Sequence, residues 1–476
     1  MSHLLRRTAF GARPDEEAAF SRLTYVTAVD GLVNFDPAQT DVDGKIGASG
    51  YANITATSAF SPNTNIDHAR QRWLFRMVHS PAPLQEKMAL IWHQHFATAY
   101  SKIAGMIPST EATRLMAAKR SADPAGQRGQ IDLFREAGMG SFRDLLVEVA
   151  KDPAMLYWLD GRLNTKNNPQ ENFGRELMEL FTFGVEHYVE ADVYAAARVF
   201  SGWNLLASLR NSSTVAFTFN YVANNHDTGA KDFSFPIYSN GSKRIEARNA
   251  ASGMQDGLDL IDALAVHPET AKRLARRFWF WFVSETEEPD ESFVSSISDV
   301  YLQNDTQIKP VIRAVLMSPQ FIDPGRRYQR YSWPVEFAVR AMKEVGYVGF
   351  SVDTARSALV NMGQQLFEPP DVNGWELGQG WFSTGGMLAR MNFAAQLAQN
   401  QRFALRDAAL RAAGSPEALV DWAKRSLSVP DLSDVTTSAL LDYARAGGYT
   451  GSAEQLLNKA GGLVHLLASS GEFQIV

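Results

Sequence analysis

The sequence predicts a mainly α-helical protein, a multi-helical globular array with a small β-hairpin insertion near residues 214–235. Apolar residues recur with helical spacing in many segments, whereas a single stretch alternates with the period of a strand. The composition, 45% apolar and 21% charged, is that of a globular protein. Ten tryptophans and 28 phenylalanines also argue against disorder.

The clearest helical pattern runs from Pro83 to Thr98. Its apolar residues follow the i, i+4, i+7, i+8 spacing that places them on one stripe of an amphipathic helix. The same periodicity recurs in five further stretches, which are 141–159, 172–184, 191–203, 271–283 and 334–346.

The strand signal lies between Thr214 and Val222, where TVAFTFNYV alternates with period two. Three irregular insertions rich in turn-forming residues are expected, at 34–62, 204–250 and 367–386. Long loops of this kind are more often functional than average.

The domain organisation follows from length, because 476 residues exceed the ~250–300 at which one hydrophobic core stops growing. Residues 1–400 are expected to form the main helical domain, either as one elaborated unit or as two lobes. Residues 401–476 are expected to form a C-terminal helical extension packed on it.

Charge and composition exclude some classes of partner and indicate where in the cell the protein is expected. The net charge of −6 provides no basic field for a phosphate backbone, so nucleic acid is not expected as a partner. No cysteine is present, which removes disulfides, thiolate nucleophiles and cysteine metal sites. No membrane-spanning run or secretory signal is apparent, so a cytoplasmic location is expected, or a periplasmic or secreted one if a signal has been removed.

Several motifs occur in an order that resembles a known family. They are HLLRRTAFGARP, WHQHF, ENFGRELMELFTFGVEHYVEADVYAAARVFSGW, HDTGAK, SPQF, MGQQLFEPPDVNGW and LARMNFA. The chain resembles, from about residue 3 to roughly residue 400, the bacterial family catalogued as domain of unknown function 1800. The resemblance implies an α-helical bacterial protein and supplies neither a substrate nor catalytic residues.

The longest motif contains two carboxylates that are candidates for catalysis or metal binding. On a 3.6-residue helix Glu176 lies at the edge of the apolar stripe and Glu179 lies further round. A partly buried carboxylate must be paired, bind a cation or carry a raised pKa suited to acid–base catalysis. The alternative is that both glutamates form structural ion pairs with Arg175, Arg198 or Arg6.

Two histidines lie on the predicted helix 83–98. His95 is on its apolar stripe, and His93 points about 160° away at ~100° per residue, so the two are not expected to chelate one metal. His95 is a catalytic candidate if Glu176 faces it. The alternative is a hydrogen-bonded core histidine.

Two irregular segments carry the remaining candidates. His226, Asp227 and Lys231 follow the predicted strand and form either a solvated turn or a polar flap with a base, a metal pair and an anion contact. Asp371 follows two prolines, and nearby tryptophans suit a sugar face or an ordinary rigid turn. These tryptophans are Trp375 and Trp381.

Familiar signatures are missing. The chain has no phosphate-cradling Gly-x-x-x-x-Gly-Lys, no Gly-x-Ser-x-Gly and no His-Glu-x-x-His. Asp41, Asp43 and Gly44 resemble part of a calcium loop, but Gln39 and Gly50 stand where that loop needs acidic ligands.

The leading hypothesis is an enzyme that uses carboxylate and histidine acid–base chemistry, or a divalent cation, to hydrolyse or eliminate a carbohydrate-like substrate. Its expected catalytic residues are Glu176, His95, Asp227 and Asp371; the substrate-binding residues are Lys231, Trp375, Trp381 and Arg175; the metal ligands are His226 and Glu179. A small molecule or polysaccharide is the expected partner. The alternative is a non-catalytic scaffold or protein-binding protein whose buried charges are structural.

Overall fold

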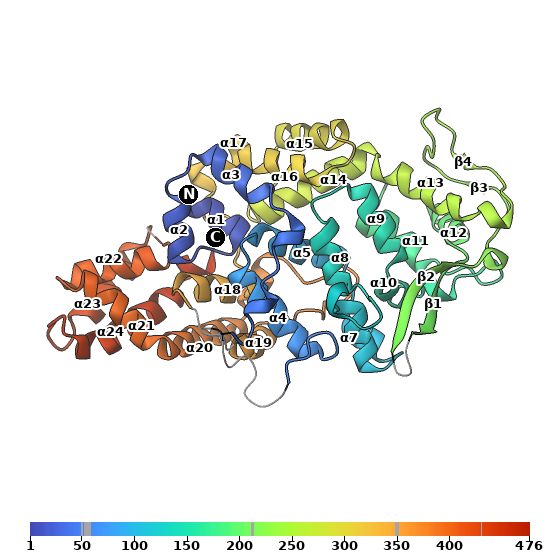
Figure 1. The fold of residues 1–476 in the computed structure, drawn as a ribbon. Helices are drawn as coiled ribbons and strands as arrows, with labels where there is room; N and C mark the ends of the chain where they lie inside the picture. Colours follow the sequence, from blue (N-terminus) through green and yellow to red (C-terminus); the bar gives the residue numbers. More distant parts are fainter. Residues whose placement is uncertain (49–50, 52–58, 211–213, 348–351, 430) are drawn as a thin grey trace.

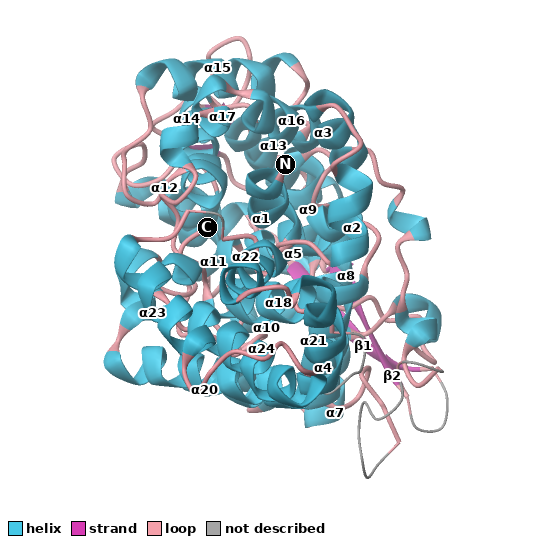
Figure 2. Cartoon of the chain, turned by 90° about the vertical axis from the view of Figure 1, so that its left-hand side faces the viewer, coloured by secondary structure: helices cyan, strands magenta, loops and turns pink. Residues whose placement is uncertain are grey.

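Helices make up most of the regular structure in the computed structural model, as the apolar periodicity predicts (Figures 1 and 2). The structure describes residues 1–48, 51, 59–210, 214–347, 352–429 and 431–476. Part of the expected insertion 34–62 therefore lies outside the described residues, as does Gly50 of the calcium-like segment.

The N-terminal half supplies the helices around which the rest assembles. In chain order they are α1 (Ser2–Ala9), α2 (Pro14–Phe20), α3 (Tyr25–Val33), α4 (Ile66–His79), α5 (Pro83–His95), α6 (Tyr100–Ala104), α7 (Ser109–Ala117), α8 (Gln130–Ala137), α9 (Phe142–Lys151), α10 (Pro153–Trp158), α11 (Asn172–Glu176) and α12 (Glu190–Val199).

The second half continues the array. Its helices are α13 (Met254–Ala265), α14 (Pro268–Phe278), α15 (Glu291–Gln303), α16 (Ile308–Met317), α17 (Pro319–Ile322), α18 (Pro334–Glu344), α19 (Val352–Asn361), α20 (Thr384–Asn400), α21 (Arg402–Ala409), α22 (Pro416–Ser426), α23 (Asp434–Arg445) and α24 (Ala453–Ala468). No helix in the described ranges is long and apolar enough to cross a membrane.

Helix α5 lies at the centre of the molecule and is buried on every side (Figure 1). The sequence predicts one apolar stripe, but the polar residues of α5 are buried too, because α1, α3, α4 and α8 pack around it. His93 and His95 therefore both lie in the protein interior.

The polar residues of α5 are accommodated by buried ion pairs. The Lys87 ammonium pairs with the Glu336 carboxylate at the first turn of α18. Arg330 donates to both oxygens of Glu336 at 3.2 Å, and Glu336 also accepts from the backbone N–H of Trp333 at 3.1 Å. These ions are at most a few per cent exposed, so each depends on the others for stabilisation.

The small β-hairpin predicted near residue 214 is present at one end of the molecule (Figure 1). Strand β1 (Trp203–Leu209) pairs antiparallel with β2 (Val215–Tyr221). β2 is the predicted strand, whereas β1 begins within the stretch predicted as helix, because Gly202 at φ +84° turns the chain after α12. A second pair, β3 (Lys231–Asp232) and β4 (Arg244–Ile245), follows.

The C-terminal helices gather at the opposite end, where α21, α22 and α23 pack with α24 and α24 packs on α20 (Figure 1). The segment also meets the N-terminal region, because Arg6 donates to the Ser428 carbonyl at 2.8 Å. The last residue returns to the body, since Arg330 and Val476 exchange backbone hydrogen bonds.

Candidate functional site

The longest motif of the sequence folds into α11 followed by a π-helical turn, Leu177–Phe181. In such a turn each N–H bonds to the carbonyl five residues before it, and the rare insertion occurs frequently at functional sites. The Thr182 hydroxyl donates to the Leu177 carbonyl at 2.6 Å, and Gly184 at φ +90° lets the chain leave the turn. Glu176 is the last residue of α11 before the wider turn.

Glu176 is half-buried and has no hydrogen bond or ion pair with any residue that the structure describes. Burial raises the pKa of its carboxyl to about 7, with a further rise from Glu179 that Arg175 partly opposes. At neutral pH the side chain therefore exchanges readily between its acid and its carboxylate form.

The arginines that the sequence offers as partners for this glutamate bond elsewhere. Arg175 pairs with Glu190 at 2.5 Å and with Glu171 at 3.4 Å. Arg198 donates to Asp227 at 2.9 and 3.0 Å, and Arg6 donates to a backbone carbonyl. None of the three forms the structural ion pair with Glu176 that the alternative requires.

Glu179 differs from Glu176 in having a partner. The Tyr188 hydroxyl donates to it at 2.5 Å, and burial together with this carboxylate raises the pKa of Tyr188 to about 12. Glu179 also acts electrostatically on Arg273 of α14, although burial lowers the pKa of Arg273 by more than Glu179 raises it.

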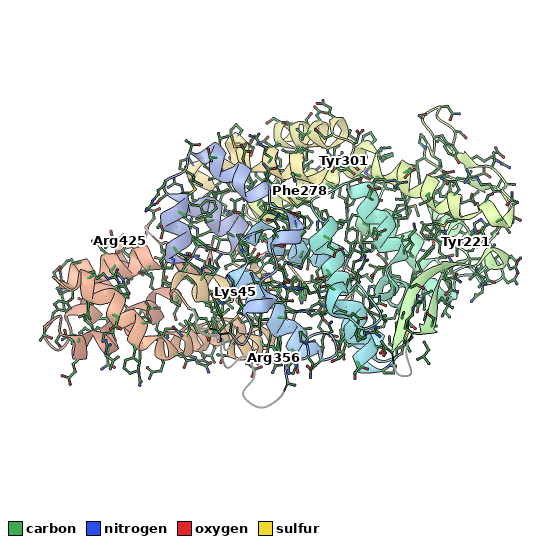
Figure 3. The ribbon with its side chains drawn as sticks, viewed as in Figure 1. Lys45, Tyr221, Phe278, Tyr301, Arg356 and Arg425 are labelled. Atoms are coloured by element: carbon green, nitrogen blue, oxygen red, sulfur yellow. The ribbon has the colours of Figure 1, made fainter. Side chains whose placement is uncertain are left out.

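Helix α14 contributes two cations and ends in a second π-helical turn, Trp279–Val283. Arg273 and Arg277 stand four residues apart and share one helix face. Arg277 lies over the Trp281 ring at 5.8 Å and has no carboxylate partner among the described residues. Burial, with Arg273 adding to it, lowers the pKa of Arg277 to about 9. Phe278, between helix and turn, lies near the middle of the molecule in Figure 3.

His95 connects α5 to both π-helical turns. Its Nε2 lies 3.1 Å from the Phe181 carbonyl, and its ring packs at 6.1 Å from the Trp281 ring. Burial lowers the pKa of His95 well below its usual value, and the charges of Arg277 and Arg273 lower it further. We call Glu176, Glu179, Arg273, Arg277 and His95 the Glu176 cluster. The structure gives no direct contact between His95 and Glu176.

His93 lies in a separate aromatic environment formed by Trp73, Phe367 and Trp375. Burial lowers the pKa of His93 to about 3, so the ring is neutral at physiological pH. The two histidines of the WHQHF motif therefore contact different parts of the core.

The residues after the hairpin form a second polar group. Its hydrogen bonds and ion pairs do not involve the Glu176 cluster. His226 donates from Nε2 to the Asp256 carboxylate over 3.2 Å, and Lys231 donates to the same oxygen of Asp256 at 2.6 Å. All three side chains are fully buried. Asp227 instead pairs with Arg198 near the surface. The polar flap of the sequence analysis is thus divided between a buried network and a surface ion pair.

Sequence reasoning missed Asp256, the acceptor at the centre of this buried network. Its side chain also accepts from Arg248 at 2.9 Å. Hydrogen bonds from His226 and Lys231 keep the pKa of Asp256 below its usual range although burial alone would raise it. The signal was present, because Asp256 precedes Leu260 and Leu264 by four and eight residues and so shares the buried stripe of α13.

The segment after the two prolines behaves as a rigid turn. Asp371 is exposed and its Oδ1 accepts from the Asn373 N–H at 2.8 Å. Trp375 exchanges backbone hydrogen bonds with the Gln94 amide at 2.8 Å. Trp375 and Trp381 are only 4% and 6% exposed, so both rings belong to the core.

The two expected metal ligands lie with different partners, His226 beside Asp256 and Glu179 beside Tyr188. Within the described ranges no three His, Asp or Glu side chains come together in a way that could hold a metal ion. In the calcium-like segment, Asp43 pairs with Arg76 at 2.7 Å and Asp41 pairs with Lys119.

The described residues form a mainly helical protein with two π-helical turns, Leu177–Phe181 and Trp279–Val283. The chain belongs to the family described as "Protein of unknown function (DUF1800)", which it matches over residues 3–475. The match continues through the C-terminal segment that the sequence analysis treats as an extension. No curated protein and no solved structure matches the chain.

Proposed function

We propose that this protein is an enzyme in which Glu176 acts as the general acid or base. The observation that carries the proposal is a half-buried carboxyl with no partner among the described residues, at the junction of a helix and a π-helical turn. A pKa of about 7 suits a group that must both give and take a proton at neutral pH. Perturbed carboxyls of this kind concentrate at functional sites.

The neighbouring charges suggest how such a site would divide its roles. Glu179 is held by Tyr188 and is the second carboxylate that acid–base cleavage needs. Arg277 has no carboxylate partner among the described residues and Arg273 is only partly compensated by Glu179, so an anionic group on the substrate would complete them.

The substrate class proposed is an acidic carbohydrate-like molecule, cleaved by hydrolysis or by elimination. Two carboxylates suit acid–base cleavage of a glycosidic bond, and an arginine beside a substrate carboxylate favours removal of the proton next to it. Stacking by Trp375 and Trp381 gains no support, because both rings are in the core. Arg175 is occupied by Glu190, so Arg277 replaces it as the proposed substrate contact.

The test is a screen of neutral and acidic oligosaccharides with the full chain, followed by Glu176→Gln on any substrate found. We expect a loss of about 100-fold or more in kcat without any fall in the melting temperature. Glu186→Gln is the matched control, because Glu186 is an exposed glutamate ten residues away in the same motif. If Glu176→Gln is as active as the parent protein, Glu176 is not the general acid or base.

The alternative is a non-catalytic scaffold, and one observation favours it. His226, Lys231 and Asp256 satisfy one another in the interior, as structural charges do. A screen without any turnover would support this function. The metal-assisted form of the enzyme rests on His226 and Glu179, and metal analysis of protein purified without added metal tests it: a stoichiometry near zero removes it.

A further inference from the structure

A cavity of about 280 Å³ lies between the β1–β2 hairpin, the junction of α9 and α10, and the loop after α7. This volume is near the lower end of the range for small-molecule sites, roughly 300 Å³. The hairpin side of the cavity is found in Figure 3 by the labelled Tyr221, the last residue of β2. None of the candidate catalytic, substrate-binding or metal-binding residues lines it.

Positive charge is in excess around the cavity. Lys151, Arg120 and Arg210 line it, and none of the three forms an ion pair with a residue that the structure describes. Arg128, also in the lining, is already paired with Glu148. The uncompensated cations favour an anionic occupant.

Asp152, the one other carboxylate in the lining, is only partly ionised at neutral pH. Its Oδ2 accepts from the Met155 N–H and from the Gln130 amide, each at 2.9 Å. Burial raises the pKa of Asp152 to about 7, while Arg128 and Glu148 act in opposite directions on it. An anion in the cavity would favour the protonated form, which can donate a hydrogen bond.

Part of the lining is apolar. Phe217 and Phe219 of β2 line the cavity, and the Lys151 ammonium lies 5.6 Å from the centre of the Phe219 ring. The backbone N–H of Phe217 donates to the Gln127 side chain at 3.0 Å, which fixes the strand against the loop. The space therefore offers both cationic groups and apolar surface to one ligand.

We propose that this cavity binds a small organic anion, with its charged group against Lys151, Arg120 and Arg210 and its apolar body against Phe217 and Phe219. The site is independent of the Glu176 cluster, with which it shares no residue. A phosphate monoester and a carboxylate both have this chemistry.

Isothermal titration of the full chain with phenyl phosphate and with benzoate tests the proposal and distinguishes the two anions. We expect saturable binding of at least one, and weaker binding of phenol and of inorganic phosphate, each of which offers half of the ligand. Lys151→Met and Arg210→Gln should each weaken binding about tenfold. Arg425→Gln, an exposed arginine at the other end of the molecule, is the control (Figure 3).

Further measurements distinguish the contribution of the phenylalanines from that of the cations. Phe219→Ala should weaken phenyl phosphate or benzoate and leave inorganic phosphate unchanged. Absence of saturable binding by both organic anions would overturn the proposal, as would unchanged affinity in both cation variants. If inorganic phosphate binds as tightly as phenyl phosphate, Phe217 and Phe219 do not contribute to binding, and that part of the proposal is wrong. Arg210 is exposed, so its variant keeps the test valid if Lys151→Met does not fold.

Discussion

His95 donates a hydrogen bond from Nε2 to the carbonyl oxygen of Phe181, over 3.1 Å. A carbonyl oxygen can only accept, so Nε2 carries the proton and the ring is the neutral tautomer protonated there. The bond joins the last residue of the central helix to the last residue of the π-helical turn that follows Glu176. The geometry of the turn thus depends on a buried histidine in another part of the chain.

Replacement of this histidine is expected to destabilise the protein. His95→Leu leaves the Phe181 carbonyl without its donor, which should lower the free energy of unfolding by about 1–3 kcal/mol. His95→Gln keeps an N–H donor and should cost less. Urea unfolding at pH 7 measures both, and equal stability of the leucine variant and the parent would contradict the assignment.

Glu176→Gln should change the pH dependence of stability as well as activity. Burial raises the pKa of Glu176 in the folded state to about 7 from its usual 4.5, so the folded protein binds more protons than the unfolded one between these values. Stability from this group is therefore present below pH 4.5 and is lost as pH rises through 7. We expect the variant to be relatively more stable at pH 8 than at pH 4.5.

Melting curves of Glu176→Gln and its parent at the two pH values give the measurement. Glu186→Gln, exposed to solvent, should leave the difference between pH 4.5 and pH 8 unchanged. A parallel pH profile for Glu176→Gln and the parent would mean that Glu176 titrates as an ordinary surface carboxylate.

Much of the fold could be predicted because helices and strands leave their periods in the sequence. The segment 271–283 is helical as expected, and Thr214–Val222 contains β2. Two features had no local signal. β1 starts where a helical period was still visible, and α5 is buried on its polar side because distant helices surround it.

The candidate site could be predicted only in part. Periodicity placed Glu176 at the edge of a buried stripe, and the structure has it half-buried. Periodicity could not predict that Arg175 would pair with Glu190, or that the charges of Arg273 and Arg277 would act on His95, since these interactions depend on tertiary packing. The π-helical turns were missed for a different reason, because one wider turn at the end of a helix changes the apolar spacing of the segment only slightly.

Glu336→Gln should be among the most damaging single substitutions. It leaves the buried cations Lys87 and Arg330 without their shared carboxylate, which should cost about 3–5 kcal/mol. Chemical unfolding measures the loss. Adding Lys87→Met should recover part of the lost stability, because it removes one of the two uncompensated charges. If the two substitutions instead lower the free energy of unfolding additively, Lys87 and Glu336 are not coupled.

His93→Phe should make the protein more resistant to acid. Burial lowers the pKa of His93 to about 3, below its unfolded value of 6.5, so the unfolded chain binds the extra proton and stability falls as pH drops from 6.5 towards 3. Phenylalanine does not titrate and keeps an aromatic ring among Trp73, Phe367 and Trp375. Melting temperatures at pH 7 and pH 4 give the comparison, and an equal drop in variant and parent would contradict it.

The ion pair between Lys87 and Glu336 has a consequence for biosynthesis. Roughly 250 residues separate the two, so at about 5–20 residues per second the ribosome delivers the glutamate tens of seconds after the lysine. Until then the central helix carries a cation that its final surroundings cannot yet neutralise. Folding of the core is therefore expected to be completed only after Glu336 has left the ribosome.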